Sequence, residues 1–138
     1  MFKKLMLVSI ISVNMGYTLF LFPLLGVLYP KRIPFTINNL LAFTFVDTFW
    51  GILFATLIHT ISYVIKKVKI NTSIVRVTSL SIITLWIISW SISILSVSDP
   101  SKMTMDDIII IGADGVAAII TGITFLALAK RININITK

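Results

Sequence analysis

The sequence predicts an all-α integral membrane protein in which four transmembrane helices form an up-down bundle. Hydrophobic residues make up 57% of the 138 residues and charged residues only 12%, whereas about a quarter of the residues in a soluble domain are charged. The mean hydropathy of +1.03 agrees with this excess. The chain contains four apolar runs, each long enough to cross a hydrocarbon core of roughly 30 Å as a helix of about 20 residues. Backbone groups in lipid must be paired within their own segment, so these runs are predicted to be helices.

The four runs make the whole chain, residues 1–138, one membrane domain. None of them shows the alternating pattern, about ten residues per strand, that is typical of a membrane β-barrel. The first run is too long for a signal peptide and no small-residue cleavage site follows it, so we expect a retained helix. The predicted helices comprise residues 5–29, 40–65, 74–97 and 108–129.

The basic residues predict the orientation, because cytoplasmic loops carry an excess of lysine and arginine. An N-terminus in the cytoplasm places nine of the 12 basic residues on the inner side: Lys3, Lys4, Lys66, Lys67, Lys69, Arg76, Lys130, Arg131 and Lys138. The outer loops then keep Lys31, Arg32 and Lys102. We therefore expect a multipass protein of the cell membrane with both termini cytoplasmic. Its first partner is the lipid bilayer, and nothing in the charge pattern indicates nucleic acid.

The predicted loops, residues 30–39, 66–73 and 98–107, are short. Short loops make sequential helices antiparallel neighbours, and they leave no room for a soluble domain. Asp106 and Asp107 suit the start of the last helix, because the N-terminal end of a helix carries partial positive charge.

Two acids lie inside apolar runs, and they are predicted to lie at the same depth. Asp47 is about seven residues from the outer end of the second helix, and Asp114 is about six from the outer end of the fourth, so both lie roughly 10 Å below that boundary. Each acid is followed by small residues at i+4 and i+8, a spacing that lets membrane helices approach closely. These predicted packing residues are Gly51, Ala55, Ala118 and Gly122.

Two interpretations of the acid pair stay open. A charge at this depth is unfavourable by a few kcal/mol, so each acid should face the bundle interior and find partners. If hydroxyls or basic side chains bind them, they form a structural clasp between helices. If the two carboxylates lie close together, they titrate as a coupled pair that shares one proton, which is a proton or cation site. The candidate partners are Asn14, Tyr17, Tyr29, Lys31, Arg32, Thr44, Thr48, Ser89, Trp90 and Ser91.

Catalytic and cofactor chemistry finds little support in the sequence. The chain has no cysteine and a single histidine, His59, and it contains no Ser-His-Asp set, HExxH, phosphate-binding loop or dinucleotide-binding motif. The segment "MTMDD" at residues 103–107 could collect a metal ion weakly, but a loop followed by a helix cap explains it better. We expect no enzyme, no cofactor and no metal site.

Two functions from different classes fit these observations. The first is a non-enzymatic accessory or structural subunit that packs within a larger membrane complex, through other membrane subunits or self-association. The alternative is a small homo-oligomeric transporter or channel, coupled to protons or cations, that uses an Asp47/Asp114 layer. The first predicts co-purifying membrane subunits, and the second predicts that removing the charge of either acid abolishes transport.

Overall fold

The computed structural model describes residues 2–96 and 104–134, with the side chains of 92–96 left aside. These residues form helices and no strand. The predictions that concern Asp99, Lys102, Met103, Lys138 and most of the second outer loop lie outside the described residues. The elements are α1 (Phe2–Gly16), η1 (Tyr17–Leu21), α2 (Phe22–Leu28), α3 (Ile37–Val68), α4 (Ile74–Ser96) and α5 (Met105–Arg131).

Four helical segments are long and apolar enough to cross a membrane, as the composition predicts. The first, Phe2–Leu28, joins α1, η1 and α2 into one continuous helix, which we call the first span. The others are Ile37–Val68, Ile74–Ser91 and Met105–Arg131. The predicted number and order of the helices are therefore correct for the described part of the chain.

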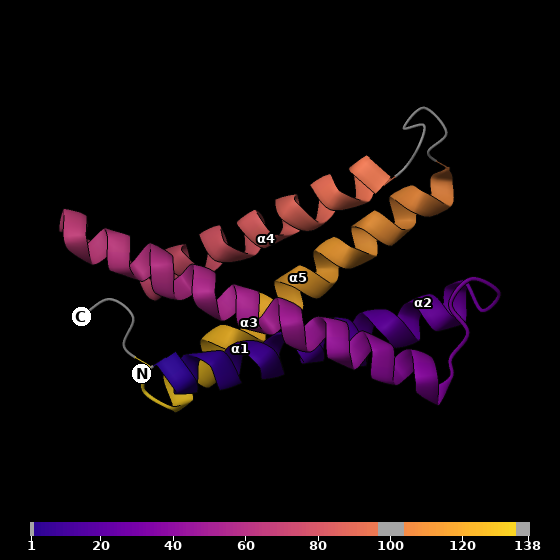
Figure 1. Ribbon diagram of the computed structural model, residues 1–138, viewed down its shortest axis with the longest axis horizontal. Coiled ribbons are helices and arrows are strands. Elements are labelled where there is room, and N and C mark those ends of the chain that lie inside the picture. Colours follow the sequence, from indigo (N-terminus) through magenta and orange to yellow (C-terminus); the bar gives the residue numbers. More distant parts are fainter. Residues whose placement is uncertain (1, 97–103, 135–138) are drawn as a thin grey trace.

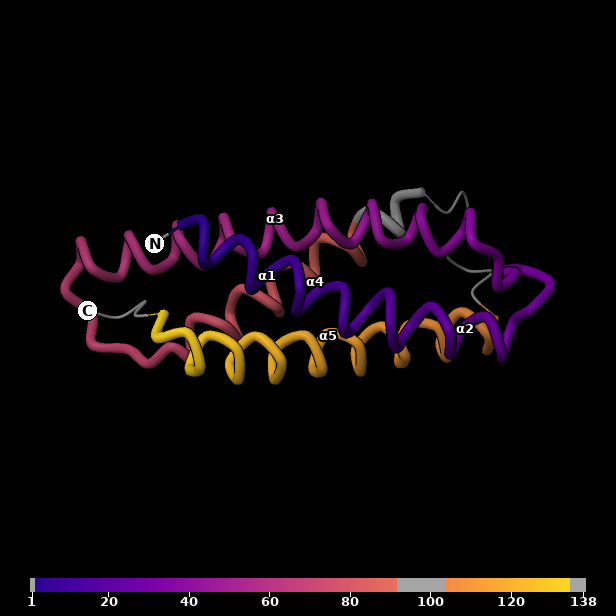
Figure 2. The backbone as a smooth tube through the Cα atoms, turned by 90° about the horizontal axis from the view of Figure 1, so that it is seen from below, coloured from indigo at the N-terminus to yellow at the C-terminus, as the bar shows by residue number. Residues whose placement is uncertain are grey.

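The helices form a ring in which each one contacts the next in sequence and α5 returns to α1. Figure 2 shows the first span lying between α3 and α5. The first span is accordingly the most buried, with 50% of its most apolar window covered, against 17% for α4. α1 begins and α5 ends at the same end of the bundle (Figure 1), and we call it the termini end.

α3 and α5 extend beyond the predicted runs at both ends, because polar caps, and not apolar residues, set where they start. Thr36 accepts a hydrogen bond from the Asn39 N–H at 3.2 Å, so α3 starts at Ile37 and not at residue 40. Lys69 ends this helix in the left-handed conformation, with φ of 58°. A prediction made from hydropathy begins at the first apolar residue and misses such a cap.

A π-helical turn, η1, interrupts the first span just before Pro23. The Phe22 N–H bonds to the Tyr17 carbonyl, five residues back. Proline has no N–H, and its ring collides with the carbonyl four residues earlier in a regular helix, here that of Leu19. The wider π turn places the proline without breaking the helix. This turn was not predicted, although Pro23 inside an apolar run was its signal.

The centre of the bundle is packed by aromatic rings and by glycines. Phe54 and Phe125 are fully buried and meet edge to face across the ring, with centroids 5.2 Å apart. A Cβ atom added at Gly51 would lie 2.6 Å from the Ile10 Cα atom. The glycine therefore lets the backbones of α3 and α1 approach.

The small residues of α5 pack differently. A Cβ atom at Gly122 would lie 2.6 Å from Ile82 Cδ1 of α4, so the small-residue stripes of α3 and α5 face different helices and not each other. Gly16, which the sequence did not single out, faces Ala117 and Thr121 of α5 in an equally close contact.

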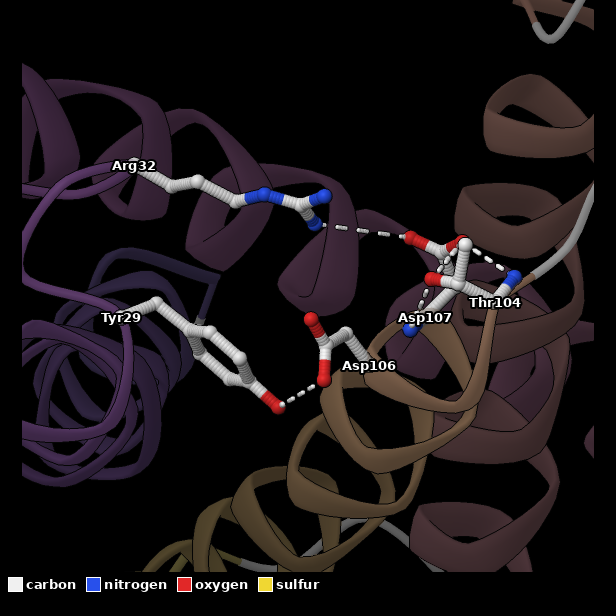
Figure 3. A network of polar contacts seen from close by, with 5 residues as sticks. All are labelled: Tyr29, Arg32, Thr104, Asp106 and Asp107. Atoms are coloured by element: carbon white, nitrogen blue, oxygen red, sulfur yellow. Dashed lines mark hydrogen bonds and ion pairs between the residues drawn. The ribbon is translucent and has the colours of Figure 1, made fainter.

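Polar contacts join the first loop to the start of α5 at the end opposite the termini (Figure 3). The Tyr29 hydroxyl donates to Asp106 Oδ1 at 3.5 Å, and Arg32 lies 3.9 Å from Asp107. Partial desolvation and the Asp106 charge raise the pKa of the Tyr29 hydroxyl, so it stays a donor at neutral pH. Thr104 and Asp107 form a capping box, in which the side chain of each accepts from the backbone N–H of the other.

Replacing Thr104 by alanine should lower the free energy of unfolding by about 1 kcal/mol, because one N-terminal N–H of α5 loses its acceptor. Replacing Arg32 by alanine should change it less, since its ion pair with Asp107 is long and both side chains are solvent-exposed. Unfolding in mixed micelles, followed by circular dichroism, measures both. An Arg32→Ala effect larger than that of Thr104→Ala would contradict this ranking.

Candidate functional site

A cavity of about 210 Å³ lies inside the bundle between α3 and α4, with the first span and α5 completing its wall. Figure 1 shows α3 and α4 diverging away from the termini end. The lining of the cavity is mostly apolar and aromatic, and it includes the two acids of the apolar helices, Asp47 and Asp114. The full lining is Val13, Tyr17, Leu21, Phe43, Asp47, Trp50, Phe54, Ile82, Leu85, Trp86, Ser89, Asp114, Ala118 and Thr121.

Asp47 is held by a side chain of the π turn. Only 4% of its surface is exposed, and its Oδ2 atom accepts a hydrogen bond of 2.5 Å from the Thr18 hydroxyl. The Thr18 hydroxyl also lies 3.1 Å from Asn14 Oδ1. A threonine hydroxyl carries one proton and can donate to only one acceptor at a time.

The three groups can therefore hold either of two proton arrangements. With Asp47 ionised, Thr18 donates to the carboxylate. With a proton on Asp47, the acid donates to Thr18, and Thr18 turns its own proton to Asn14. In both arrangements Thr18 and Asp47 stay hydrogen-bonded to each other, so this contact can persist when the acid gains or loses a proton.

Asp114 has different neighbours on the opposite wall. Its carboxylate is half-buried and interacts with the Tyr17 hydroxyl and the Trp86 indole N–H. Trp86 Nε1 is buried near the acid without a well-aligned hydrogen bond to any described residue, so we take the indole contact as electrostatic and loosely directed. Tyr17 lies between the acids, close enough to interact with the charge of both.

The two acids line the same cavity and lack a basic partner among the described residues. Within residues 2–96 and 104–134, the one ion pair joins Arg32 to Asp107, so neither Asp47 nor Asp114 is paired with a cation. The predicted reach of Lys31 or Arg32 to these acids is not what the structure has, because Arg32 points to the start of α5.

The cavity lining includes both predicted acids, and of their predicted partners it includes Tyr17 and Ser89. Thr48 is not in the lining, because its hydroxyl donates to the Thr44 carbonyl of its own helix at 2.7 Å. The residue after Asp47 lies about 100° round the helix, so Thr48 turns away from the acid that it follows in sequence.

The predicted packing residues lie along the edges of the site. Gly51 and Ala55 are buried beneath Asp47 on α3, and Ala118 and Gly122 are buried beneath Asp114 on α5. Ala118 also lines the cavity. The spacing places each acid on the inward face of its helix, one turn from the first small residue.

Two side chains of the site, Thr18 and Trp86, are absent from the predicted partners of the acids. Trp90, a predicted partner, instead meets the Trp86 ring edge to face, with centroids 5.8 Å apart. Depth along the helices suggested candidate partners, but the rotation of each helix, and of the first span after its π turn, decided which side chains meet.

Comparison with models of protein families, with curated proteins and with solved structures finds no match for this chain.

Proposed function

We propose that this chain is a small membrane transporter that binds a proton or another cation at Asp47 and Asp114 and moves it across the bilayer. The observation that carries the proposal is that these acids, from helices far apart in the sequence, line one cavity within the bundle and have no basic partner among the described residues. Ionisable groups inside membrane segments are unfavourable and commonly mark ion or proton pathways.

The hydrogen bonding of Asp47 supports proton exchange in particular. Thr18 can hydrogen-bond to Asp47 with or without a proton on the acid, because its own proton can turn to Asn14 Oδ1. Asp114, in contrast, interacts with the Tyr17 hydroxyl and lies near the Trp86 indole N–H, both of which favour its charged form. In this proposal the two acids have different roles: Asp47 exchanges protons, and Asp114 keeps a negative charge that attracts the cation.

Removing either charge should abolish transport while leaving the fold intact. Asp47→Asn and Asp114→Asn keep the size and most hydrogen bonds of the side chain, so we expect proton-coupled flux in reconstituted vesicles to fall at least about tenfold, the effect of roughly 1.4 kcal/mol on the rate. A pH-sensitive dye inside the vesicles measures the flux. Asp106→Asn, at the start of α5 and outside the cavity, is the matched control and should transport normally.

The outcome that would overturn the proposal is unchanged flux in both acid variants, or no flux by the wild-type protein under any ion gradient. Size-exclusion chromatography and circular dichroism of each variant exclude a loss of folding as the reason for lost flux.

A second candidate is an accessory subunit that packs within a larger membrane complex. The observation that favours it is a set of exposed polar side chains on one face of α3: Thr56, His59, Thr60 and Tyr63. Polar groups on a lipid-facing surface commonly bind other helices. Extraction in a mild detergent and identification of every co-purifying chain tests it, since a stoichiometric partner supports a subunit and a homogeneous single species opposes it.

A further inference from the structure

Besides its two acidic residues, the cavity has aromatic side chains in its walls that can bind a cation. Five aromatic side chains line it: Tyr17, Phe43, Trp50, Phe54 and Trp86. Trp50 belongs to α3 and Trp86 to α4, so indoles approach the cavity from two walls. Aromatic faces attract cations, indole most strongly, and the attraction grows when water is excluded.

The same lining is poor in the ligands that a bare metal ion requires. Mg²⁺ demands six ligands in octahedral geometry and Ca²⁺ six to eight oxygens. No group of three or more histidine, cysteine, aspartate or glutamate side chains occurs in the described part of the chain. Beyond the two carboxylates, the oxygen atoms come mainly from Tyr17, Ser89 and Thr121.

One polar group in the lining, the Thr121 hydroxyl, has no hydrogen-bond partner among the described residues. Thr121 is only 3% exposed. Buried hydroxyls are rarely left unsatisfied, so a bound molecule or water that reaches Thr121 would complete the site. The cavity volume of about 210 Å³ corresponds to about seven water molecules in the liquid, which admits a small organic molecule and excludes a drug-sized one.

We infer that the cavity binds a small organic cation, a quaternary or protonated amine with apolar substituents, held between the two indoles with Asp47 and Asp114 as its counter-charges. This inference rests on the proposed function and names its substrate class. The aromatic walls contact the apolar substituents. The positive charge of the ligand pairs with the two acids, which have no basic partner among the described residues. The same chemistry occurs in a free amine and in the choline headgroup of a lipid, and the experiment separates these two sources.

The test is equilibrium binding of radiolabelled benzyltrimethylammonium to the purified full-length protein in nanodiscs of phosphatidylglycerol, which carry no cationic headgroup. We expect saturable binding of one cation per cavity. Competition by unlabelled benzyltrimethylammonium should be complete. Competition by its neutral analogue 2,2-dimethylpropylbenzene, in which carbon replaces nitrogen, and by Na⁺ or Mg²⁺ should be at least about tenfold weaker, because they lack the charge or the apolar body.

Variants assign the binding to the cavity. Asp114→Asn and Trp86→Leu should each weaken binding about tenfold or more, whereas Asp106→Asn and Phe45→Leu should leave it unchanged. Phe45 is 79% exposed and lies outside the lining, so it is the matched aromatic control. The comparison of benzyltrimethylammonium with its neutral analogue uses the wild-type protein alone and stays decisive even if a variant fails to fold.

The two sources of the cation give different results in a second lipid. If choline headgroups are the natural occupant, nanodiscs that contain phosphatidylcholine will compete with the label, and if a soluble amine is, they will not; either result supports a cation site. Equal binding of the neutral analogue, or no saturable binding in any lipid, overturns the inference. Proton flux that depends on Asp47 without cation binding would overturn the substrate class and leave the proposed transport standing, and binding without flux would do the reverse.

Discussion

Replacing Gly51 by alanine should destabilise the bundle by about 1–3 kcal/mol, the usual effect of overpacking a filled site. The added Cβ would lie 2.6 Å from Ile10 Cα and 3.0 Å from Ile10 N, so backbone must move. Gly16→Ala should act in the same way, because its Cβ would meet the Ala117 carbonyl oxygen and the Thr121 hydroxyl. Both changes push the first span, the most buried helix of the ring, away from a neighbouring helix.

Gly112→Ala is the matched control for this prediction. It lies in α5 with no atom within 4 Å of the added Cβ, so it should keep only the higher helix propensity of alanine, worth up to about 1 kcal/mol in its favour. Unfolding in mixed micelles of rising sodium dodecyl sulfate content, followed by circular dichroism, measures all three variants. If Gly51→Ala unfolds at the same midpoint as Gly112→Ala, the close approach of α1 and α3 is wrong.

Replacing Thr18 by valine should cost about 1–3 kcal/mol of stability, because the buried Asp47 carboxylate loses its hydroxyl donor. Asp47→Leu should be tolerated better, since Thr18 can then donate to Asn14 Oδ1, 3.1 Å away. The double variant removes the buried carboxylate together with its donor and should be more stable than Thr18→Val alone. The double-mutant cycle then isolates the coupling between the two side chains.

Thr56→Val is the control for this cycle. Its hydroxyl donates to the Ile52 carbonyl of its own helix at 2.9 Å, on an exposed face of α3, so its loss should change stability by less than about 0.5 kcal/mol. The same micelle titration gives the four free energies of the cycle. Additive effects of Thr18→Val and Asp47→Leu would mean that the hydrogen bond of 2.5 Å contributes nothing.

The helices could be predicted from the sequence because a chain in lipid must pair its backbone N–H and C=O groups within each segment. Apolar runs of sufficient length must be helices, and short loops such as residues 66–73 make sequential helices neighbours. The helix ends were less accurate, since Thr36 and Thr104 lie before the apolar residues that hydropathy detects. The orientation of the bundle in a membrane stays a prediction from the basic residues at the termini end.

The candidate site could be predicted only in part. The spacing of Asp47 from Gly51 and Ala55 indicated that the acid lies on the packed face of its helix, and the structure has it buried there. The partner of that acid could not be predicted, because contact between two helices depends on their relative rotation as well as on depth. Thr48 was favoured by its nearness in sequence, whereas Thr18, 29 residues away, provides the hydrogen bond.

The π turn has a consequence for how the first span tolerates changes in length. The turn adds one residue to the helical repeat, because the Phe22 N–H bonds to the Tyr17 carbonyl five residues back and not four. Deleting one residue from Tyr17–Leu21 would restore regular helix and rotate one half of the span against the other by about 100°. Val13 and Leu21 could then no longer share one wall of the cavity. In this segment the number of residues is as strictly constrained as their identity. A scan of single-residue deletions along the first span would locate this constraint.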